Sequence, residues 1–309
     1  MPELPDAHQE AFARHLADLW PSVEAAPRLH GFPISRHPAW KQWRALTGQE
    51  ANSWWCTSLE QAQRHYSWTQ RESGEPFEVL AAGLRAALDE GDEAGARHFC
   101  LAIFTWGGVA KKPDDGSRLW VERQFANATL CRQMLAAVAL LQPGSMASLA
   151  CFDGADLLMN AAMTKVYAAA SPASLIIYDG RVGAALGLLA RRLLAAQGTI
   201  GVPASLAFRW GAAQTRPYDS RNPSQAGYAF QSLYQQSRRA ERHPDRLWAE
   251  LVRGSSTMLL RARELLTGRG IRTSLGDFEQ ALFMLGFNVR YPLHDEPRAG
   301  AQRLPATCA

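Results

Sequence analysis

The stretch that decides the fold reads MTKVYAAASPASLIIYDGRVGAALGLLARRLL and spans residues 163–194. Its second half belongs to a segment, residues 179–196, that is apolar on most faces and predicts a helix at the centre of the core. The short apolar run LIIY precedes this helix at residues 175–178. Pro172 ends an earlier helix, expected over residues 156–170, because proline cannot continue one. We therefore expect two helices joined by a short connection.

Helical spacing of apolar residues recurs along the rest of the chain. The predicted helices cover residues 6–19, 78–90, 93–105, 117–141, 227–240, 244–267 and 275–285. Strand-like alternation is rare, and neither a sequence repeat nor a heptad array is present. The predicted fold class is therefore mainly α, a globular multi-helix fold.

Composition divides the chain into three parts. Residues 1–75 form an N-terminal segment rich in Trp and Pro, which we expect to contain short helices and loops packed through Trp40, Trp43, Trp54, Trp55 and Trp68. Residues 76–290 hold the helical core. Residues 291–309 are Pro-rich and are expected to be a loose tail.

The cysteines and the apolar segments indicate a cytoplasmic protein. The five Cys are widely spaced and make no CxxC pair, which fits a reducing compartment rather than a disulfide framework. No signal peptide and no uncharged apolar stretch of about 20 residues is evident, so no membrane span is expected. The eight His lack metal-binding spacing, and no metal or other cofactor is predicted.

Positive charge gathers in the second half of the chain. Residues 181–300 contain 17 Arg, no Lys and 9 acidic residues, for a net charge of +8. Because arginine binds phosphate through a planar fork, this half suits an anionic partner such as nucleic acid. An Arg-rich composition with solvated helix faces explains the same pattern, and charge alone does not separate the two interpretations.

Asp179 is the first candidate for chemistry. It begins a buried helix, where free N–H groups and a partial positive charge keep a carboxylate ionised. Such a carboxylate can stabilise an oxocarbenium ion or activate water. The plain alternative is a residue that only caps its helix.

Lys165 is the second candidate, in a largely apolar helix. A partly buried lysine has a lowered pKa and can act as an amine nucleophile. The alternative is a lysine whose ammonium group reaches water while its stem packs on the protein.

Together the segments MTKV, Pro172 and IYDGRV resemble the core of the helix–hairpin–helix DNA glycosylase superfamily, in particular its 8-oxoguanine glycosylase branch. The resemblance covers about 30 residues, from roughly Asp156 to Leu189. It places the catalytic lysine at Lys165 and the catalytic aspartate at Asp179. Arg181 stands where the family often has histidine, and it is expected to contact a phosphate, to hold Asp179 or to lie at the surface.

The resemblance implies a monomeric enzyme that acts on double-stranded DNA and extrudes a base before cutting its glycosidic bond. Asp179 would stabilise the sugar cation and guide water or Lys165 to the anomeric carbon. Lys165 would give a Schiff base and strand cleavage, whereas water leaves an abasic site. The interval of 14 residues between Lys165 and Asp179 is shorter than the family's, and it favours water. The stretch NAAMT at 160–164 lacks the glycines of the family's DNA-anchoring hairpin.

Further residues are candidates for binding. Glycine admits close approach of a ligand, tryptophan offers a stacking face and paired lysines suit phosphate, which singles out Trp106, Gly107, Gly108, Lys111 and Lys112. A plain helix stop with a solvated loop explains this segment as well. Tyr178 could stack on the extruded base or pack in the core. A phosphate track is predicted at Arg216, Arg221, Arg238, Arg239 and Arg242.

The substrate remains open between an oxidised purine and a base modified by a phage, the second implying antiviral defence. Two other classes of protein compete with a glycosylase. One is a non-catalytic DNA-binding or scaffold protein on the same helical core, and the other is an enzyme that acts on a small molecule.

Overall fold

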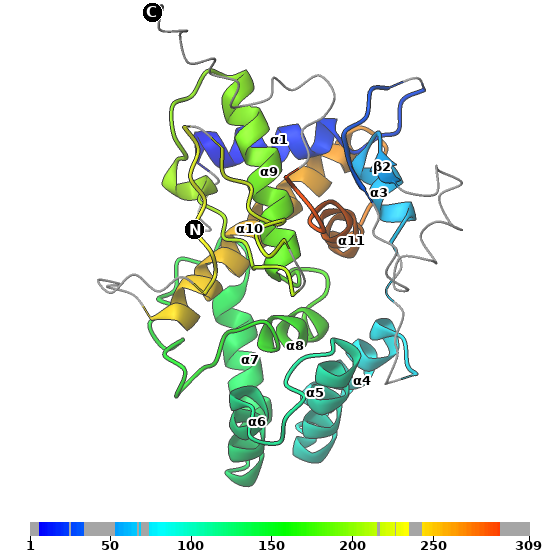
Figure 1. Ribbon diagram of the computed structural model, residues 1–309. Coiled ribbons are helices and arrows are strands. Elements are labelled where there is room, and N and C mark those ends of the chain that lie inside the picture. The colour runs from blue at the N-terminus through cyan, green and yellow to red at the C-terminus, as the bar shows by residue number, and fades with distance from the viewer. Residues whose placement is uncertain are drawn as a thin grey trace, which may run out of the picture.

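The computed structural model describes residues 6–24, 26–33, 53–66, 68, 74–214, 217–225, 227–234 and 243–290. Over these residues the chain is mainly helical, as predicted, and the one sheet described has two strands (Figure 1). The long helix α10 (Pro244–Gly268) crosses the molecule diagonally in this view. Trp40, Trp43 and the tail 291–309 lie outside the described residues.

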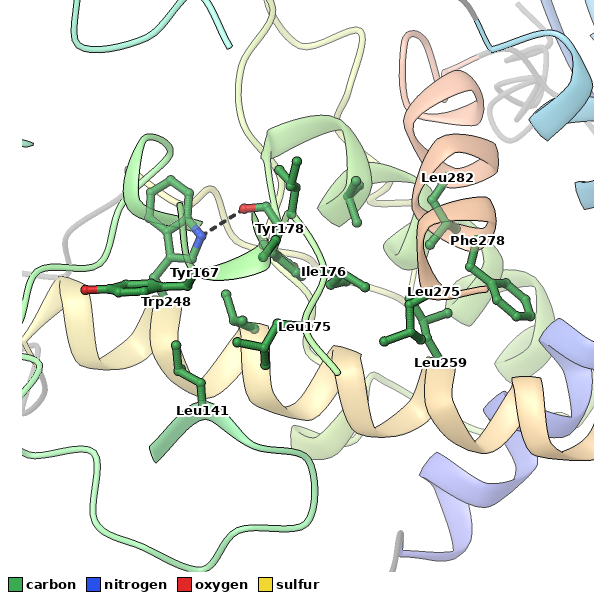
Figure 2. Packing of buried hydrophobic residues seen from close by; sticks show 14 of the residues in the cluster. Leu141, Tyr167, Leu175, Ile176, Tyr178, Trp248, Leu259, Leu275, Phe278 and Leu282 are labelled. Carbon is green, nitrogen blue, oxygen red and sulfur yellow. Dashed lines mark hydrogen bonds between the residues drawn. The ribbon is translucent and has the colours of Figure 1, made fainter. Parts of the chain in front are cut away.

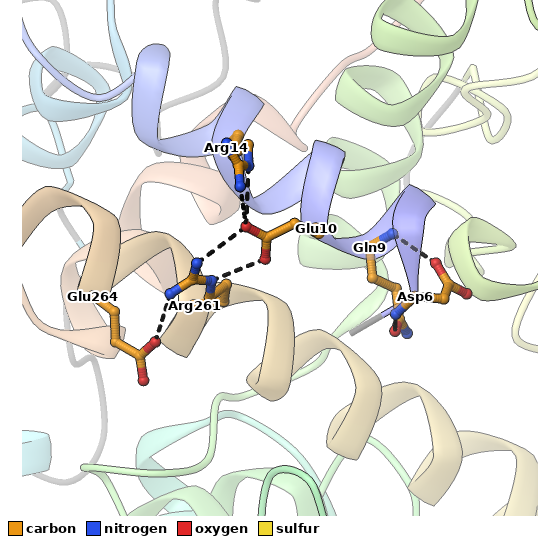
Figure 3. Close-up of polar contacts among 6 residues, drawn as sticks. All are labelled: Asp6, Gln9, Glu10, Arg14, Arg261 and Glu264. Atoms are coloured by element: carbon orange, nitrogen blue, oxygen red, sulfur yellow. Dashed lines mark hydrogen bonds and ion pairs between the residues drawn. The ribbon is translucent and has the colours of Figure 1, made fainter. Parts of the chain in front are cut away.

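The N-terminal elements pack onto the C-terminal helices. Helix α1 (Ala7–Asp18), which Asp6 caps, lies on α10. An ion-paired network joins them, in which Arg261 of α10 donates from Nε to Glu10 at 2.9 Å (Figure 3). Helix α3 (Leu59–Arg64) packs against α11 (Leu275–Leu285).

The sequence predicts short helices and loops before residue 75, and the structure adds a two-stranded sheet there. Strands β1 (His30–Pro33) and β2 (Ser53–Cys56) pair antiparallel, with His30 opposite Cys56. Phe32 stacks on the fully buried Trp54, with ring centroids 4.9 Å apart. Four-residue strands are too short to produce a visible alternation of apolar residues, which is why the sequence pattern missed them.

The middle of the chain forms a second group of helices. Helices α4 (Phe77–Glu90) and α5 (Glu93–Trp106) agree with the predicted bounds to within one residue. The single helix predicted over residues 117–141 is wrong. The chain forms α6 (Gly116–Ala126) and α7 (Leu130–Leu141), separated by a turn in which Ala128 takes a positive φ of 51°.

The central stretch forms helices α8 (Met163–Ala170) and α9 (Gly180–Ala196). Helix α8 begins seven residues later than predicted, because residues 156–162 form bends and a turn. A short 3-10 helix, η2 (Ala204–Leu206), follows α9. The helix predicted over residues 227–240 is wrong in its described part, where residues 227–234 form turns and isolated bridges, and Gly227 has a φ of 85°.

One large cluster of buried apolar residues runs through both groups of helices. Figure 2 shows part of it, to which Leu141 of α7, Leu175, Leu259 of α10 and Leu275 of α11 contribute side chains. Helix α9 is covered on one side by α11 and on another by the chain after η2. None of the helices in the described ranges is long and apolar enough to cross a membrane.

Candidate functional site

Two N–H groups of the run at residues 175–178 are bonded by side chains of the C-terminal helices. Ile176 donates to Ser256 Oγ of α10 at 3.3 Å. Ile177 donates to Glu279 Oε2 of α11 at 2.7 Å. Both bonds supply partners for backbone groups that would otherwise be buried without one. The run is thus fixed against both helices.

The end of the run is fixed by α8 and α10. The Tyr178 N–H donates to Thr164 Oγ1 at 2.9 Å, and the Trp248 indole donates to the Tyr178 carbonyl at 3.0 Å (Figure 2). Thr164 precedes Lys165, and Tyr178 precedes Asp179. The bond between Thr164 and Tyr178 therefore sets the position of α9's first residues relative to the start of α8.

Asp179 is the N-cap of α9. Its Oδ1 accepts from the N–H groups of Arg181 at 2.8 Å and Val182 at 3.0 Å. Burial disfavours its charged form, but the charges of Arg181, Lys165 and Arg221 and the Val182 N–H outweigh this effect, so its pKa is lowered. Its side chain remains 18% exposed. Asp179 is therefore an ionised carboxylate that caps its helix and is still reached by solvent.

Lys165 lies in the first turn of α8 and is buried. Its Nζ donates to the Ala161 carbonyl at 2.8 Å. Burial lowers its pKa, although Asp179 and Glu279 favour the charged form. Its stem passes so close to Gly107 that a methyl group on that residue would lie 2.5 Å from Cδ. Two separate sequence candidates, Lys165 and Gly107, are thus in contact.

Glu279 is a member of this site that the sequence analysis missed. Burial and the charge of Asp179 raise its pKa to about 8, while the Ile177 N–H and Lys165 act in the opposite direction. Asp179 and Lys165 each alter the pKa of the other and that of Glu279, and Glu279 alters the pKa of Lys165. We call these three residues the charged triad.

Arg181 lies beside the charged triad in a group of aromatic rings. Its guanidinium carbon is 5.7 Å from the ring centroid of Trp68, 4.5 Å from Phe283 and 4.4 Å from Phe287. Its Nη1 is 3.8 Å from Asp179 Oδ2. Of the expected roles for Arg181, the structure places it against Asp179 rather than at the surface.

The ring of Tyr178 is buried in the core. Its hydroxyl donates to the Arg209 carbonyl at 3.0 Å and accepts from the Arg209 N–H at 2.9 Å. Of its two predicted roles, this position corresponds to core packing. Tyr234 is 65% exposed, and burial together with the charge of Asp179 raises its pKa, so it lies near the triad.

The end of α5 combines a helix stop with a buried ring. Trp106 ends the helix, Gly108 has a φ of 61°, and Trp106 packs on Phe77 with ring centroids 4.6 Å apart. The Trp106 indole N–H has no hydrogen-bond partner among the described residues. Lys111 and Lys112 are exposed in the loop that follows. The predicted helix stop is confirmed, and binding by this segment stays a prediction.

The predicted phosphate track is described at one position. Arg221 is partly buried, and its pKa is lowered to about 10 by burial and by Arg181, against the effect of Asp179. It therefore lies near the charged triad. The other four members, Arg216, Arg238, Arg239 and Arg242, lie outside the described residues.

The N–H groups at the start of α8 are occupied by the chain itself. Asn160 Oδ1 accepts from Ala162 at 2.9 Å and from Met163 at 3.1 Å, and the Asn160 carbonyl accepts from Thr164 at 3.0 Å. A phosphate bound by these groups would have to displace Asn160. In this conformation the start of α8 is not an anion site.

Comparisons with known proteins assign the chain to no family. The chain matches no family model, and no curated protein and no solved structure is significantly similar to it. Within the described parts of the chain, no three His, Cys, Asp or Glu side chains are placed to hold a metal ion.

Proposed function

We propose that this protein is a DNA glycosylase that removes a damaged or modified base and leaves an abasic site. The supporting observation is the placement of Asp179 and Lys165. They stand at the starts of consecutive helices, joined through Thr164 and Tyr178, and each alters the pKa of the other. This is the pairing that the resemblance to the 8-oxoguanine glycosylase branch implies.

The chemistry proposed for Asp179 follows from its charge. A lowered pKa keeps it ionised at neutral pH, and its partial exposure allows approach by a substrate. A fixed carboxylate beside the anomeric carbon stabilises the positive charge that develops as the glycosidic bond breaks. Asp179 then guides the nucleophile to that carbon.

Water is the proposed nucleophile. Lys165 is buried, and its Nζ is engaged with the Ala161 carbonyl. Its lowered pKa would make an amine available, but the nitrogen must leave this bond before it can attack. We therefore propose a monofunctional enzyme. Strand cleavage through Lys165 is the alternative reaction.

The proposed substrate is an oxidised purine in double-stranded DNA, with a phage-modified base as the second candidate. The 17 Arg of residues 181–300 favour a polyanionic partner. The test incubates excess protein with duplexes that carry 8-oxoguanine, 5-hydroxymethylcytosine or no modification, and then cleaves abasic sites with alkali. Strand breaks confined to a modified duplex are expected. Breaks in none of them would contradict the proposal.

A small-molecule enzyme is the alternative favoured by one observation. The occupied N–H groups at the start of α8 leave no ready phosphate anchor there. Titration of a labelled duplex at increasing salt separates the two functions. A DNA-acting enzyme loses affinity steeply with salt, whereas a small-molecule enzyme shows no such binding.

A further inference from the structure

Glu279 belongs to the charged triad but comes from a different part of the chain. It lies on α11, which packs against α9, whereas Lys165 and Asp179 stand at the starts of α8 and α9. One of its oxygens, Oε2, is held by the Ile177 N–H at 2.7 Å. Among the described residues the other oxygen has no hydrogen-bond partner, and the side chain is partly exposed. Glu279 is thus a positioned carboxyl group with one oxygen available.

The neighbours of Glu279 decide its protonation. Asp179 on α9 is held ionised, and a second carboxylate close to it is disfavoured by like-charge repulsion. Tyr66, in the chain after α3, is neutral, and burial and the charge of Glu279 raise its pKa further. Lys165 and Arg181 bring positive charge from α8 and α9. Burial and Asp179 prevail, and the pKa of Glu279 rises to about 8.

Two carboxyl groups of opposite protonation in one site form a familiar arrangement for breaking a glycosidic bond. The ionised group stabilises the sugar cation, and the neutral group supplies a proton to the leaving group. Base removal needs the same two functions, because a base departs more readily when it is protonated. Asp179 at the start of α9 and Glu279 on the neighbouring helix α11 meet these two requirements.

We propose that Glu279 is the general acid of the reaction and donates its proton to the base as the bond breaks. This inference rests on the proposed glycosylase function. The bond between the anomeric carbon and the base nitrogen breaks, its electron pair goes to the base, and the Glu279 proton joins the base. Water adds to the anomeric carbon, and the proton it releases restores Glu279. The net reaction is hydrolysis.

The test is Glu279→Gln, measured as single-turnover base release from the modified duplex between pH 6 and 9.5. The amide oxygen can still accept from Ile177, so the connection to the run is retained. A general acid contributes roughly 100-fold or more to a rate. We expect the wild-type rate to fall above a pH of about 8, the variant to be about 100-fold slower with no such fall, and the affinity for DNA to stay within about twofold.

The matched control is Glu264→Gln, the same change at an exposed residue of α10, which should behave as wild type. A Glu279→Gln protein with the wild-type rate, or with the same fall above pH 8, would overturn the inference alone. A variant that is slow only because it binds DNA poorly would also overturn it, since that marks a structural role. A wild-type protein that releases no base would overturn the proposed function and this inference with it.

Discussion

Replacing Thr164 with valine tests whether the hydrogen bond from the Tyr178 N–H to the Thr164 hydroxyl holds the start of α9 against the start of α8. Valine has nearly the same shape, so packing is kept. It cannot accept the hydrogen bond that the Tyr178 N–H now donates to Thr164 Oγ1 at 2.9 Å. Both residues are fully buried, and no water can replace the lost oxygen without a rearrangement. A buried donor without a partner costs about 1–3 kcal/mol, so we expect the unfolding free energy to fall by about 2 kcal/mol.

Urea denaturation followed by circular dichroism measures this change. Thr164→Ser is the control, because it keeps the hydroxyl group and loses only a methyl group, at a cost of about 1 kcal/mol. Thr164→Val should also slow base release, since Asp179 follows Tyr178 directly, whereas Thr164→Ser should not. If the valine variant is as stable as wild type, the hydroxyl does not hold the run, and the reasoning is refuted.

Three further predictions concern the site. Lys165→Ala should keep base release within about tenfold, and borohydride should trap no adduct with wild-type protein; a trapped adduct would make Lys165 the nucleophile. Tyr234→Ala should weaken DNA binding about tenfold through lost stacking, whereas Tyr234→Phe and the equally outward Tyr218→Ala should not; equal loss in both alanine variants would remove Tyr234 from the site. The pKa of Glu279 rises on folding from 4.5 to about 8, so its stabilising effect is full below pH 4.5 and is lost as pH rises through 8. The unfolding free energy of Glu279→Gln, by urea titration, should lack this decline, and an identical pH profile would contradict the raised pKa.

Most long helices were predictable because their apolar residues repeat at helical spacing over many turns. Helices α5 and α10 were predicted from this pattern and from the residues that mark where a helix begins and ends, and the structure confirms both. The pattern failed where one turn interrupts it without a break in periodicity. At Ala128 a positive φ separates α6 from α7, and alanine gives no sequence signal for that conformation.

The site could be predicted only where its residues are close in sequence. Asp179 was found because an apolar run followed by an acid and a helix marks an N-cap, which the structure confirms. Glu279 was missed because it lies 100 residues further on, in a helix that also contains Asp277 and where an acid gives no signal by itself. The available signal was its position between Phe278 and Leu282, which face the core. Only the packing of α11 on α9 brings its charge to Asp179.

The most direct test of the account is base release by Asp179→Asn. Asparagine can still cap α9 through its side-chain oxygen, so the fold is retained while the negative charge is removed. The exposed Asp114→Asn is the matched control. We expect both proteins to bind the modified duplex as wild type does, and single-turnover release to fall at least about 100-fold in Asp179→Asn alone. Release at the wild-type rate by Asp179→Asn would contradict the central claim that this carboxylate carries the chemistry.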